Sequence, residues 1–457
     1  MNICLIGANY VGLVTAGCFA EYGYRIDIVD RDSKKIEGLK KNIPPMYEPG
    51  LESLLSSAHE NGQIKYYESL SEIQNFLPDI IIIAIDPIYN DLGDVDLSDV
   101  LDGIESICNS IVRDHYTVIM IRSTMPVGTA RTIKKRIKFL RPDLIIGEHY
   151  DIVVVPGFLR EGSAIHDFVM GYRIVIGLDD DAKKAKKYML ELHDPLIKND
   201  IPIIFCSVET AELIKEAANS FLAIKIAFIN EFADVCERTG ADINTLVLGL
   251  GLDPRIGNKC MNIGPGFGGY ALNRDTRIIA KLANTLGVDL SLVQASIKSN
   301  EDRKISMVRK IINISQDIGG IKDKNICFLG ATFKPETSEI RFSIAMFIIE
   351  KLLNQGANIY LYDPIYSSEY GKIHNIFENR KNVNIVNNPY DAANQSDMII
   401  IATEWNEFRE IDFDKMKELM NKFPNKKPII IDLRNLFPAE NMKDFEYISV
   451  GRPRVLG

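Results

Sequence analysis

The first thirty residues read as a strand, a glycine turn, a helix and a second strand. Residues 2–7 form an apolar run, residues 8–22 have helical periodicity, and residues 25–30 resume as a strand that ends on Asp30. The turn between the first strand and the helix is Gly7-Ala-Asn-Tyr-Val-Gly12. This order predicts a βαβ unit, in which a helix joins two parallel strands.

The turn occupies the place of the dinucleotide-binding fingerprint G-x-G-x-x-G. Asn9 stands at the middle glycine, which in the fingerprint lets the backbone approach a pyrophosphate. Asp30 lies at about the distance expected for the acid that binds the ribose. The turn alone leaves open both a dinucleotide site and a doubly wound domain without a dinucleotide. The predicted contacts of a dinucleotide are Gly7, Asn9, Tyr10, Val11, Gly12, Asp30 and, in a later loop, Thr124.

The alternation of strands and helices continues along the chain. Further strands are expected at 79–85, 116–122, 151–155 and 173–177, so about the first 200 residues form one α/β domain with a mostly parallel sheet. Apolar residues recur every three or four positions from 209 to 238, which predicts a long helix. A second βαβ series begins at 325 and continues with strands at 358–363, 398–403 and 428–432. We therefore predict an α/β chain of two Rossmann-like doubly wound domains joined by a long central helix and a small helical domain, with bounds 1–205, 206–318 and 319–457.

Composition restricts the class of partner. A chain of 457 residues, 46% apolar and 25% charged, is typical of a soluble globular enzyme, and a net charge of −9 argues against nucleic acid and anionic membranes as partners. Met1 leads into a strand-like run rather than a signal peptide, and the apolar run 80–85 is too short to span a bilayer, so we expect a cytoplasmic protein. The seven cysteines have no CxxC or metal-ligand spacing, which predicts core thiols and no metal site.

The densest glycine segment has four glycines in the six residues 264–269, and its loop runs to Asp275 before a helical pattern begins at Thr276. Backbone N–H groups and free φ angles let such a loop fold around a phosphate or a sugar. The segment closely resembles the signature of the nucleotide-sugar 6-dehydrogenases, the UDP-glucose and GDP-mannose dehydrogenase family. Tyr270 and Ala271 stand where that family has serine and its catalytic cysteine.

The resemblance covers essentially the whole chain and implies NAD as cofactor and a role in polysaccharide biosynthesis. Three strand ends match the family, at residues 45–51, 123–128 and 158–162. A fourth departs, because Asp86-Pro87-Ile88 replaces a Gly-Thr-Pro that contacts the cofactor. That exchange puts an anion near a phosphate site, so we expect the NAD site to be weakened.

The family oxidises the C6 hydroxyl of a nucleotide sugar twice with two NAD, through a thioester on the cysteine. The resemblance assigns the first oxidation to Thr124, Lys215, Asn219 and Asp275, which are all present. A lysine and a carboxylate near one alkoxide can share its proton, while an amide fixes its position. By spacing alone, Lys215 and Asn219 fit equally well a hydrogen-bonded pair on a polar helix face.

The second oxidation needs a thiolate and a carboxylate, and the resemblance puts these groups at Ala271 and Gly157. A methyl group and a glycine can perform neither role. Other positions depart as well, among them Asn9, Asn273 and Arg274, so the divergence looks natural rather than a single engineered exchange.

The residues that bind the nucleotide-diphosphate sugar are mostly retained. Arginine and lysine suit a diphosphate through fork geometry and charge. The counterpart of Arg255 reaches across a subunit boundary in the family, which implies a homodimer. Ser338, Glu339, Phe342 and Ile344 replace family residues, so the sugar can differ from glucose. The implied substrate contacts are Phe158, Leu159, Lys215, Asn219, Arg255, Phe267, Gly268, Lys334, Arg341 and Arg434.

Three hypotheses follow. The first is a dimeric nucleotide-sugar oxidoreductase limited to two-electron NAD-linked chemistry, because the residues of the first oxidation are kept and those of the second are lost. The second is a catalytically silent nucleotide-sugar-binding paralogue with a regulatory or scaffolding role, which Asn9 and Asp86 favour. The third, a full dehydrogenase with a relocated nucleophile, is the weakest, because Cys260 lies too far from position 271 in sequence.

Overall fold

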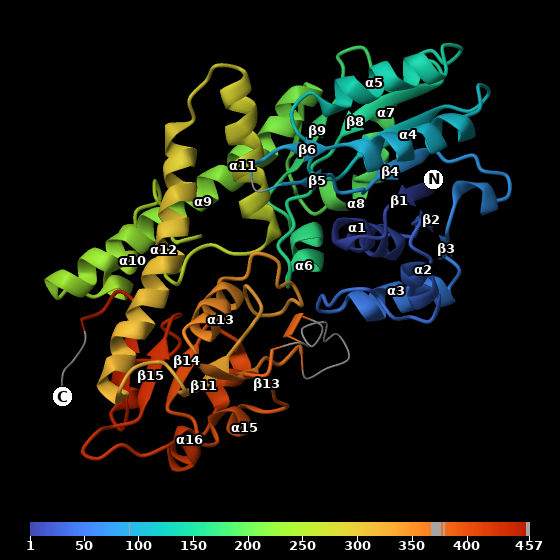
Figure 1. The fold of residues 1–457 in the computed structure, drawn as a ribbon. Helices are drawn as coiled ribbons and strands as arrows, with labels where there is room; N and C mark the ends of the chain where they lie inside the picture. Colours follow the sequence, from blue (N-terminus) through green and yellow to red (C-terminus); the bar gives the residue numbers. More distant parts are fainter. Residues whose placement is uncertain (91, 367–375, 378–379, 454–457) are drawn as a thin grey trace. The chain divides into compact units, whose positions relative to one another are not determined.

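The computed structural model describes residues 1–90, 92–366, 376–377 and 380–453 (Figure 1). The chain divides into two compact units, Met1–Ala218 and Asn219–Gly457. The division falls inside helix α9 (Val208–Thr239). Each unit contains a predominantly parallel sheet flanked by helices, so the predicted α/β class with two Rossmann-like domains is confirmed.

The first unit is built on an eight-stranded sheet in the order β10-β9-β8-β7-β4-β1-β2-β3. All neighbouring strands are parallel except β8 and β9, which are antiparallel. The strand bounds are β1 (Asn2–Ile6), β2 (Arg25–Val29), β3 (Ile64–Tyr67), β4 (Ile80–Ile83), β7 (Thr117–Ile121), β8 (Tyr150–Val154), β9 (Ile174–Gly177) and β10 (Ile203–Cys206).

Both faces of this sheet are covered. Alternate residues of β4 enter different cores: Ile80 and Ile82 belong to one cluster, Ile81 and Ile83 to the other. A strand buried on both faces is therefore apolar throughout. The helices that supply the covering side chains are α1 (Tyr10–Glu21), α2 (Ser33–Lys40), α3 (Leu51–Glu60), α4 (Ser98–Ser110), α5 (Thr129–Leu140), α6 (Ala164–Val169), α7 (Lys183–Leu192) and α8 (Asp194–Ile197).

The second unit contains the rest of α9, a group of helices that follows it, and a six-stranded sheet in the order β13-β12-β11-β14-β15-β16, parallel throughout. The helices after α9 are α10 (Ile243–Gly251), α11 (Tyr270–Thr285) and α12 (Ser291–Ser315). The sheet and its helices are β11 (Asn325–Leu329), α13 (Ile344–Asn354), β12 (Asn358–Tyr362), β13 (Val383–Ile385), α15 (Pro389–Ala393), β14 (Met398–Ile401), α16 (Phe413–Leu419), β15 (Ile429–Asp432) and β16 (Glu446–Ser449).

One element boundary was predicted wrongly. Helix α11 begins at Tyr270 and not at Thr276, so Ala271 and Asp275 lie in its first two turns rather than in the glycine loop. The N-cap is Gly269, whose φ of 78° is a conformation that favours glycine. The Asn273 side chain donates to the Gly269 carbonyl oxygen at 2.9 Å, which reinforces this first turn.

Two predictions about burial and membranes can be compared with the structure. Cys4, Cys18, Cys108, Cys236 and Cys327 are buried as expected, whereas Cys206 and Cys260 are only half-buried. Within the described residues, no helix is both long enough and apolar enough to cross a bilayer.

Candidate functional site

The dinucleotide turn of the first unit requires glycine at both ends. Gly7 has a φ of 106°, and a Cβ atom there would lie 2.6 Å from the Ala84 carbonyl oxygen. A Cβ atom at Gly12 would lie 2.2 Å from the Gly7 carbonyl oxygen. Any side chain at either position would therefore force the end of β1 away from α1 or from β4.

Asn9, at the position of the missing middle glycine, is the N-cap of α1. Its Oδ1 atom accepts from the Gly12 backbone N–H at 2.8 Å. Its Nδ2 group donates to the Ala84 carbonyl oxygen and, at 2.8 Å, to Asp86 Oδ2. The side chain is thus used to cap the helix and to fix the loop after β4, with the Asp86 carboxylate beside the turn.

Asp30 closes the turn from the end of β2. Its Oδ2 atom accepts from the Ala8 backbone N–H at 2.7 Å, and Lys35 Nζ lies 3.3 Å from the same oxygen. Asp30 lines a cavity of about 500 Å³ together with Gly7, Asn9, Arg31, Asp86, Asp99 and other residues of this unit. The turn, the acid and the cavity fit a dinucleotide, with Asp86 as an unfavourable charge for its phosphates. Asp99 is paired with Arg31 at 2.6 Å.

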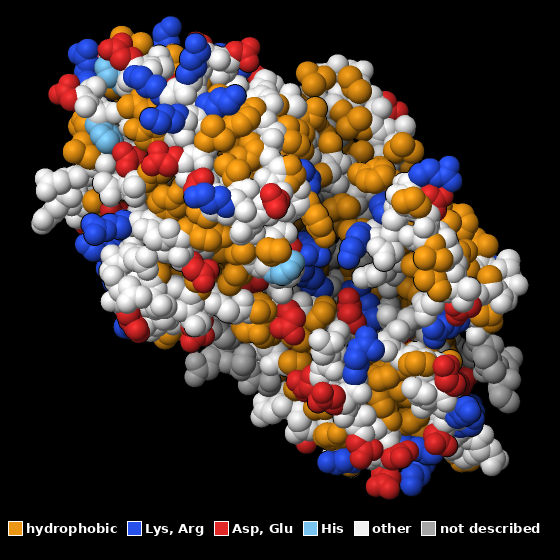
Figure 2. Space-filling view, turned by 180° about the vertical axis from the view of Figure 1, so that it is seen from behind, with side chains coloured by type: hydrophobic (Ala, Val, Ile, Leu, Met, Phe, Trp, Pro, Cys, Tyr) orange, Lys and Arg blue, Asp and Glu red, His pale blue; other side chains and the backbone are white. Residues whose placement is uncertain are grey.

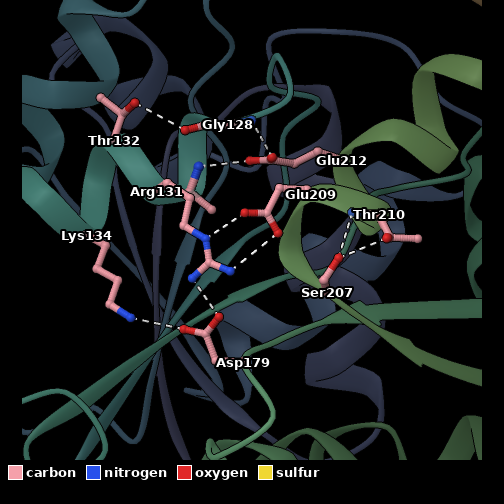
Figure 3. Close-up of polar contacts among 10 residues, drawn as sticks. Gly128, Arg131, Thr132, Lys134, Asp179, Ser207, Glu209, Thr210 and Glu212 are labelled. Carbon is pink, nitrogen blue, oxygen red and sulfur yellow. Dashed lines mark hydrogen bonds and ion pairs between the residues drawn. The ribbon is translucent and has the colours of Figure 1, made fainter.

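The loop 123–128, which contains Thr124, is held at its far end by α9 (Figure 3). Glu212 on α9 accepts from the backbone N–H groups of Gly128 at 2.7 Å and Ala130 at 2.8 Å, so it binds the open N-terminus of α5. Arg131 bridges Glu209 and Asp179, each at 2.6 Å. Burial raises the pKa of Glu212 in spite of the two N–H groups. These contacts fix the loop with half-buried Thr124 against the first turns of α9.

Lys215 lies one turn further along α9 and is only 6% exposed. Its Nζ atom lies 5.3 Å from the centroid of the Phe158 ring, and the same ring is 3.9 Å from Cζ of Arg173. Leu159 packs against the apolar core of this unit. The first unit therefore brings Lys215 to Phe158, two of the predicted substrate contacts.

Gly157 and Arg122 form a feature that the sequence prediction missed. Arg122 follows β7, is 8% exposed, and donates to the carbonyl oxygens of Val155 at 3.1 Å and Pro156 at 3.3 Å. Burial lowers its pKa to about 10. Only the pairing of β7 with β8 brings this arginine to the position where the family has its assisting glutamate.

In the second unit, Asp275 is fully buried and both of its oxygens are bound. Asn219 Nδ2 donates to Oδ2 at 2.5 Å, and Arg274 Nε lies 2.6 Å from Oδ1. The Arg274 side chain is 6% exposed. The structure thus brings Asn219 and Asp275 together, as the predicted first oxidation requires. The charge of the Asp275 carboxylate is also neutralised by Arg274, for which the sequence predicted no role.

Tyr270 and Ala271 begin helix α11. The Tyr270 ring has Arg341 Cζ at 4.2 Å and Arg274 Cζ at 5.1 Å from its centroid. Ala271 is exposed and offers only its methyl group. An aromatic ring near two cations gains cation–π attraction, so Tyr270, at the position of a small hydroxyl residue in the family, helps to hold Arg341. Arg341 is also paired with Glu339.

Three of the remaining predicted substrate contacts, Gly268, Lys334 and Arg434, lie close to Phe333, whereas Arg255 is an exception. Arg434 Nη2 donates to the Phe333 carbonyl oxygen at 3.0 Å, and Lys334 Nζ lies 5.7 Å from the Phe333 ring centroid. Phe267 is fixed by two hydrogen bonds with the Asn300 side chain, of 2.7 and 3.0 Å. Gly268 lies close to Phe333, since its Cβ atom would be 3.2 Å from that side chain. Arg255 is the exception: its exposed side chain pairs with Asp253 at 2.6 Å.

Three segments of the chain match the UDP-glucose/GDP-mannose dehydrogenase family. Its NAD binding domain matches residues 1–197, its central domain matches residues 209–302, and its UDP binding domain matches residues 327–439. The chain belongs to this family. It is accordingly an NAD-dependent, nucleotide-sugar dehydrogenase-like oxidoreductase with a UDP-sugar binding domain.

Individual relatives agree with this assignment over nearly their whole length. A UDP-glucose 6-dehydrogenase of Rhizobium meliloti (strain 1021) is 38% identical over 458 residues, covering 99% of this chain and 100% of its own. UDP-glucose 6-dehydrogenase TuaD of Bacillus subtilis (strain 168) is 37% identical, covering 100% of this chain and 94% of its own. The structure of a UDP-glucose dehydrogenase from the archaeon Pyrobaculum islandicum aligns with a TM-score of 0.84 at 29% identity, over 98% of this chain and 96% of that one.

Proposed function

We propose that the chain catalyses two-electron, NAD-linked chemistry on a nucleotide sugar and does not complete a four-electron oxidation. The observation that carries this proposal is the loss of the nucleophile: Ala271 stands at the cysteine position, and residues 261–326 contain no cysteine at all. The segment without cysteine includes the glycine loop, α11 and α12. A covalent trap for an aldehyde therefore has no thiol in this segment.

NAD supplies the hydride acceptor when it is bound, and the chain supplies binding, position and proton handling. Asp30 is the acid for the adenosine ribose, and Gly7, Asn9, Tyr10, Val11 and Gly12 form the turn for the pyrophosphate. Lys215, held on Phe158, is the candidate group that accepts the alcohol proton, with Thr124 as a hydroxyl donor. Asp275, paired with Arg274, positions Asn219 rather than accepting a proton itself.

The nucleotide diphosphate is assigned to Lys334, Arg341 and Arg434, with Phe267 and Gly268 lining the sugar. The sugar can be one other than glucose, because four family residues are replaced, by Ser338, Glu339, Phe342 and Ile344. We retain three domains with bounds 1–205, 206–318 and 319–457, a cytoplasmic location and a role in polysaccharide biosynthesis as parts of this proposal.

A homodimer is supported by an apolar stripe on α9. Phe221, Phe228, Phe232 and Val235 are all exposed, and the rings of Phe228 and Phe232 are 4.7 Å apart. Apolar side chains also gather in patches on the face shown in Figure 2. Light scattering should report a dimer, and Phe228→Glu should shift it towards monomer because a charge cannot be buried in an apolar interface.

The stoichiometry of NADH tests the reaction. Wild-type protein with NAD and the right UDP-sugar should form no more than one NADH per sugar and no uronic acid. Ala271→Cys alone should not restore a four-electron enzyme, because Gly157, Tyr270 and Asn273 still shape the pocket. A sugar that gains the mass of a carboxylate in mass spectrometry would overturn the proposal.

A silent nucleotide-sugar-binding paralogue is the second candidate, and the Asp86 carboxylate beside the dinucleotide turn favours it. Separate calorimetric titrations with NAD, NADH and UDP-glucose distinguish the two. Binding of UDP-glucose without binding of millimolar NAD or NADH would select the silent paralogue.

A further inference from the structure

The cavity at the dinucleotide turn carries more negative than positive charge. It has a volume of about 500 Å³ and is lined from the end of β2, from residues 68–70 and from helix α4. Its charged lining residues are the acids Asp30, Glu68, Asp86, Asp99 and Asp102 and the cations Arg31 and Lys35. A further negative group on a ligand would therefore meet repulsion here unless one of the two cations were available to it.

Both cations are already paired with carboxylates. Lys35 Nζ lies 3.3 Å from Asp30 Oδ2, and Arg31 Nη2 lies 2.6 Å from Asp99 Oδ1. The hydrogen bond with Asp99 and its charge raise the pKa of Arg31, and smaller contributions come from Asp102 and Asp30. Asp99 therefore holds the guanidinium, and two further acids add to the negative potential around it.

The pair of Arg31 and Asp99 connects two elements that are far apart in sequence. Arg31 is the second residue after β2 and the direct neighbour of Asp30, the acid assigned to the adenosine ribose. Asp99 lies in the first turn of α4. The Arg31 side chain is 72% exposed, so a ligand in the cavity could reach the guanidinium if Asp99 did not hold it. An ion pair this exposed contributes little to stability, so its removal should leave the fold intact.

The position of Arg31 is one at which a cation can decide between two cofactors. In dinucleotide-binding folds, an acid after the second strand binds the 2′-hydroxyl of the NAD ribose, whereas a nearby arginine accommodates the 2′-phosphate of NADP. Such a phosphate carries close to two negative charges at neutral pH. This chain has both the acid, Asp30, and an arginine, Arg31, and Asp99 pairs with the arginine.

We propose that Asp99 is a specificity-determining residue of the cofactor site: it holds Arg31 in an ion pair, so that a 2′-phosphate finds no available cation and the site selects NAD over NADP. Asp99 acts through Arg31 and is thus a positioning residue. Lys35 does not replace Arg31 in this role, because it is paired with Asp30. The inference rests on the assignment of NAD to this cavity and on no step of the proposed reaction.

Calorimetric titration of the full-length protein compares ligands that differ only in the 2′-phosphate: NAD with NADP, and AMP with adenosine 2′,5′-bisphosphate. The wild type should bind NAD at least about 10-fold more tightly than NADP, because of the repulsion in the cavity. Asp99→Asn should reduce this ratio roughly 3- to 10-fold through a gain in NADP affinity, since Arg31 becomes available to the phosphate. The melting temperature without ligand should stay unchanged.

A double variant tests whether the guanidinium is the group that Asp99 withholds. Asp99→Asn combined with Arg31→Gln should lose most of the gain in NADP affinity, because no arginine remains to bind the phosphate. A double variant that keeps most of the gain would refute the role of Arg31.

Glu105→Gln is the matched control. Glu105 also lies in α4 and pairs with an arginine, Arg136, but it is not among the described residues that line the cavity. The exchange removes the same charge and the same kind of ion pair from the same helix. It should leave the ratio of NAD to NADP affinity unchanged. Equal changes in Glu105→Gln and Asp99→Asn would show a general effect of net charge and overturn the proposal.

The outcomes separate this inference from the proposed function. Equal affinities of the wild type for NAD and NADP, or an unchanged ratio in Asp99→Asn, refute the role of Asp99 and leave the two-electron reaction intact. If NAD does not bind, the NAD-linked function fails, and the two adenosine nucleotides decide on Asp99. The wild type should then prefer AMP to adenosine 2′,5′-bisphosphate, and Asp99→Asn should reduce that preference. Equal ratios in the two proteins, or no binding of either nucleotide, refute the inference.

Discussion

The sheets of both units start with the same strand, turn, helix and strand, from β1 to β2 in the first unit and from β11 to β12 in the second, and an acid closes the turn in both. In the first unit the Ala8 backbone N–H donates to Asp30 Oδ2 at 2.7 Å. In the second, the Ala331 backbone N–H donates to Asp363 Oδ2 at 2.7 Å. The preceding glycines also match, since Gly7 and Gly330 each donate their N–H at 2.8 Å to the last residue of the neighbouring strand.

The two acids differ in what else they bind. Asp363 is 1% exposed and also accepts from Thr332, Ile365 and the Trp405 indole N–H. Asp30 lines the cavity of about 500 Å³. A repeated fold therefore does not repeat its binding site. Both acids are bound within their own units, Asp30 by the Ala8 and Asp32 N–H groups and by Lys35, but only Asp30 lines the described cavity.

Removal of each carboxylate should give the largest difference between the two units. Asp363→Ala leaves several buried N–H groups without an acceptor and should lower the free energy of unfolding by about 3–5 kcal/mol. Asp30→Ala should cost less than about 1 kcal/mol and instead weaken NAD binding roughly 10-fold. Urea unfolding and calorimetry measure both quantities, and equal losses of stability would contradict the distinction.

Charge reversal at Lys334 should change the affinity for the ligand assigned to the second unit and not the affinity for the ligand of the first. Lys334→Glu should weaken UDP binding by roughly 10- to 100-fold, because it replaces attraction to a diphosphate by repulsion, and should leave NAD binding unchanged. Lys351→Glu is a suitable control, since Lys351 also lies over a phenylalanine ring, 5.3 Å from the Phe347 centroid. A UDP affinity that is unchanged in Lys334→Glu would refute the assignment of the second unit.

The strands of both units were largely predictable from sequence, because apolar runs of four or five residues are a local signal. Strand β4 consists of four isoleucines, all buried. The edge strands of both sheets, β3, β10, β13 and β16, were missed. Strand β3 alternates buried and exposed residues, and neither β10 nor β13 contains a fully buried residue. The start of α11 was placed six residues late, because the cap is a glycine and no Ser, Thr or Asp marks it.

The candidate site was less predictable, because the features that the sequence prediction missed depend on contacts formed only in the folded chain. Arg122 and Gly157 are 35 positions apart and meet only because β7 pairs with β8. The pair Arg274 and Asp275 is adjacent in sequence, yet only burial in α11 turns it into an ion pair. An isolated arginine in a sequence carries no sign that it will be buried without a counter-ion.

A pH titration should distinguish the buried groups of the two units. Burial lowers the pKa of His193, in the first unit, from 6.5 to about 4. The unfolded chain then binds more protons between these values, so stability is lost as the pH falls from about 6.5 towards 4. Burial raises the pKa of Asp363, so in the second unit that group favours folding more as the pH falls.

The contribution of His193 can be isolated by substitution. Between pH 7 and pH 4.5 it should amount to about 2 kcal/mol, at about 1.4 kcal/mol per pKa unit. His193→Leu should therefore lose less stability than the wild type over this interval, as measured by urea unfolding at each pH. Parallel pH profiles of the two proteins would show that His193 does not titrate in this way.

The smallest expected effect concerns an acid that follows the central strand of each unit. Asp86 and Glu404 both lie three residues beyond the strand end, after Ile83 in β4 and after Ile401 in β14. Glu404 pairs with Arg434 at 3.1 Å, whereas Asp86 is held by the neutral amide of Asn9 at 2.8 Å. Asp86 lies beside the turn to which the pyrophosphate of NAD is assigned. Asp86→Asn should tighten NAD binding roughly 3- to 10-fold, the range expected for one repulsive charge near a protein surface. Higher salt should reduce the gain, because ions screen such repulsion.

Asp180→Asn, at an exposed acid of the same unit, should have no effect on NAD binding. If the Asp86 variant binds NAD no better than the wild type at low salt, the acid is not what limits the cofactor. The capping side chain of Asn9 would then be the remaining difference from a regular fingerprint.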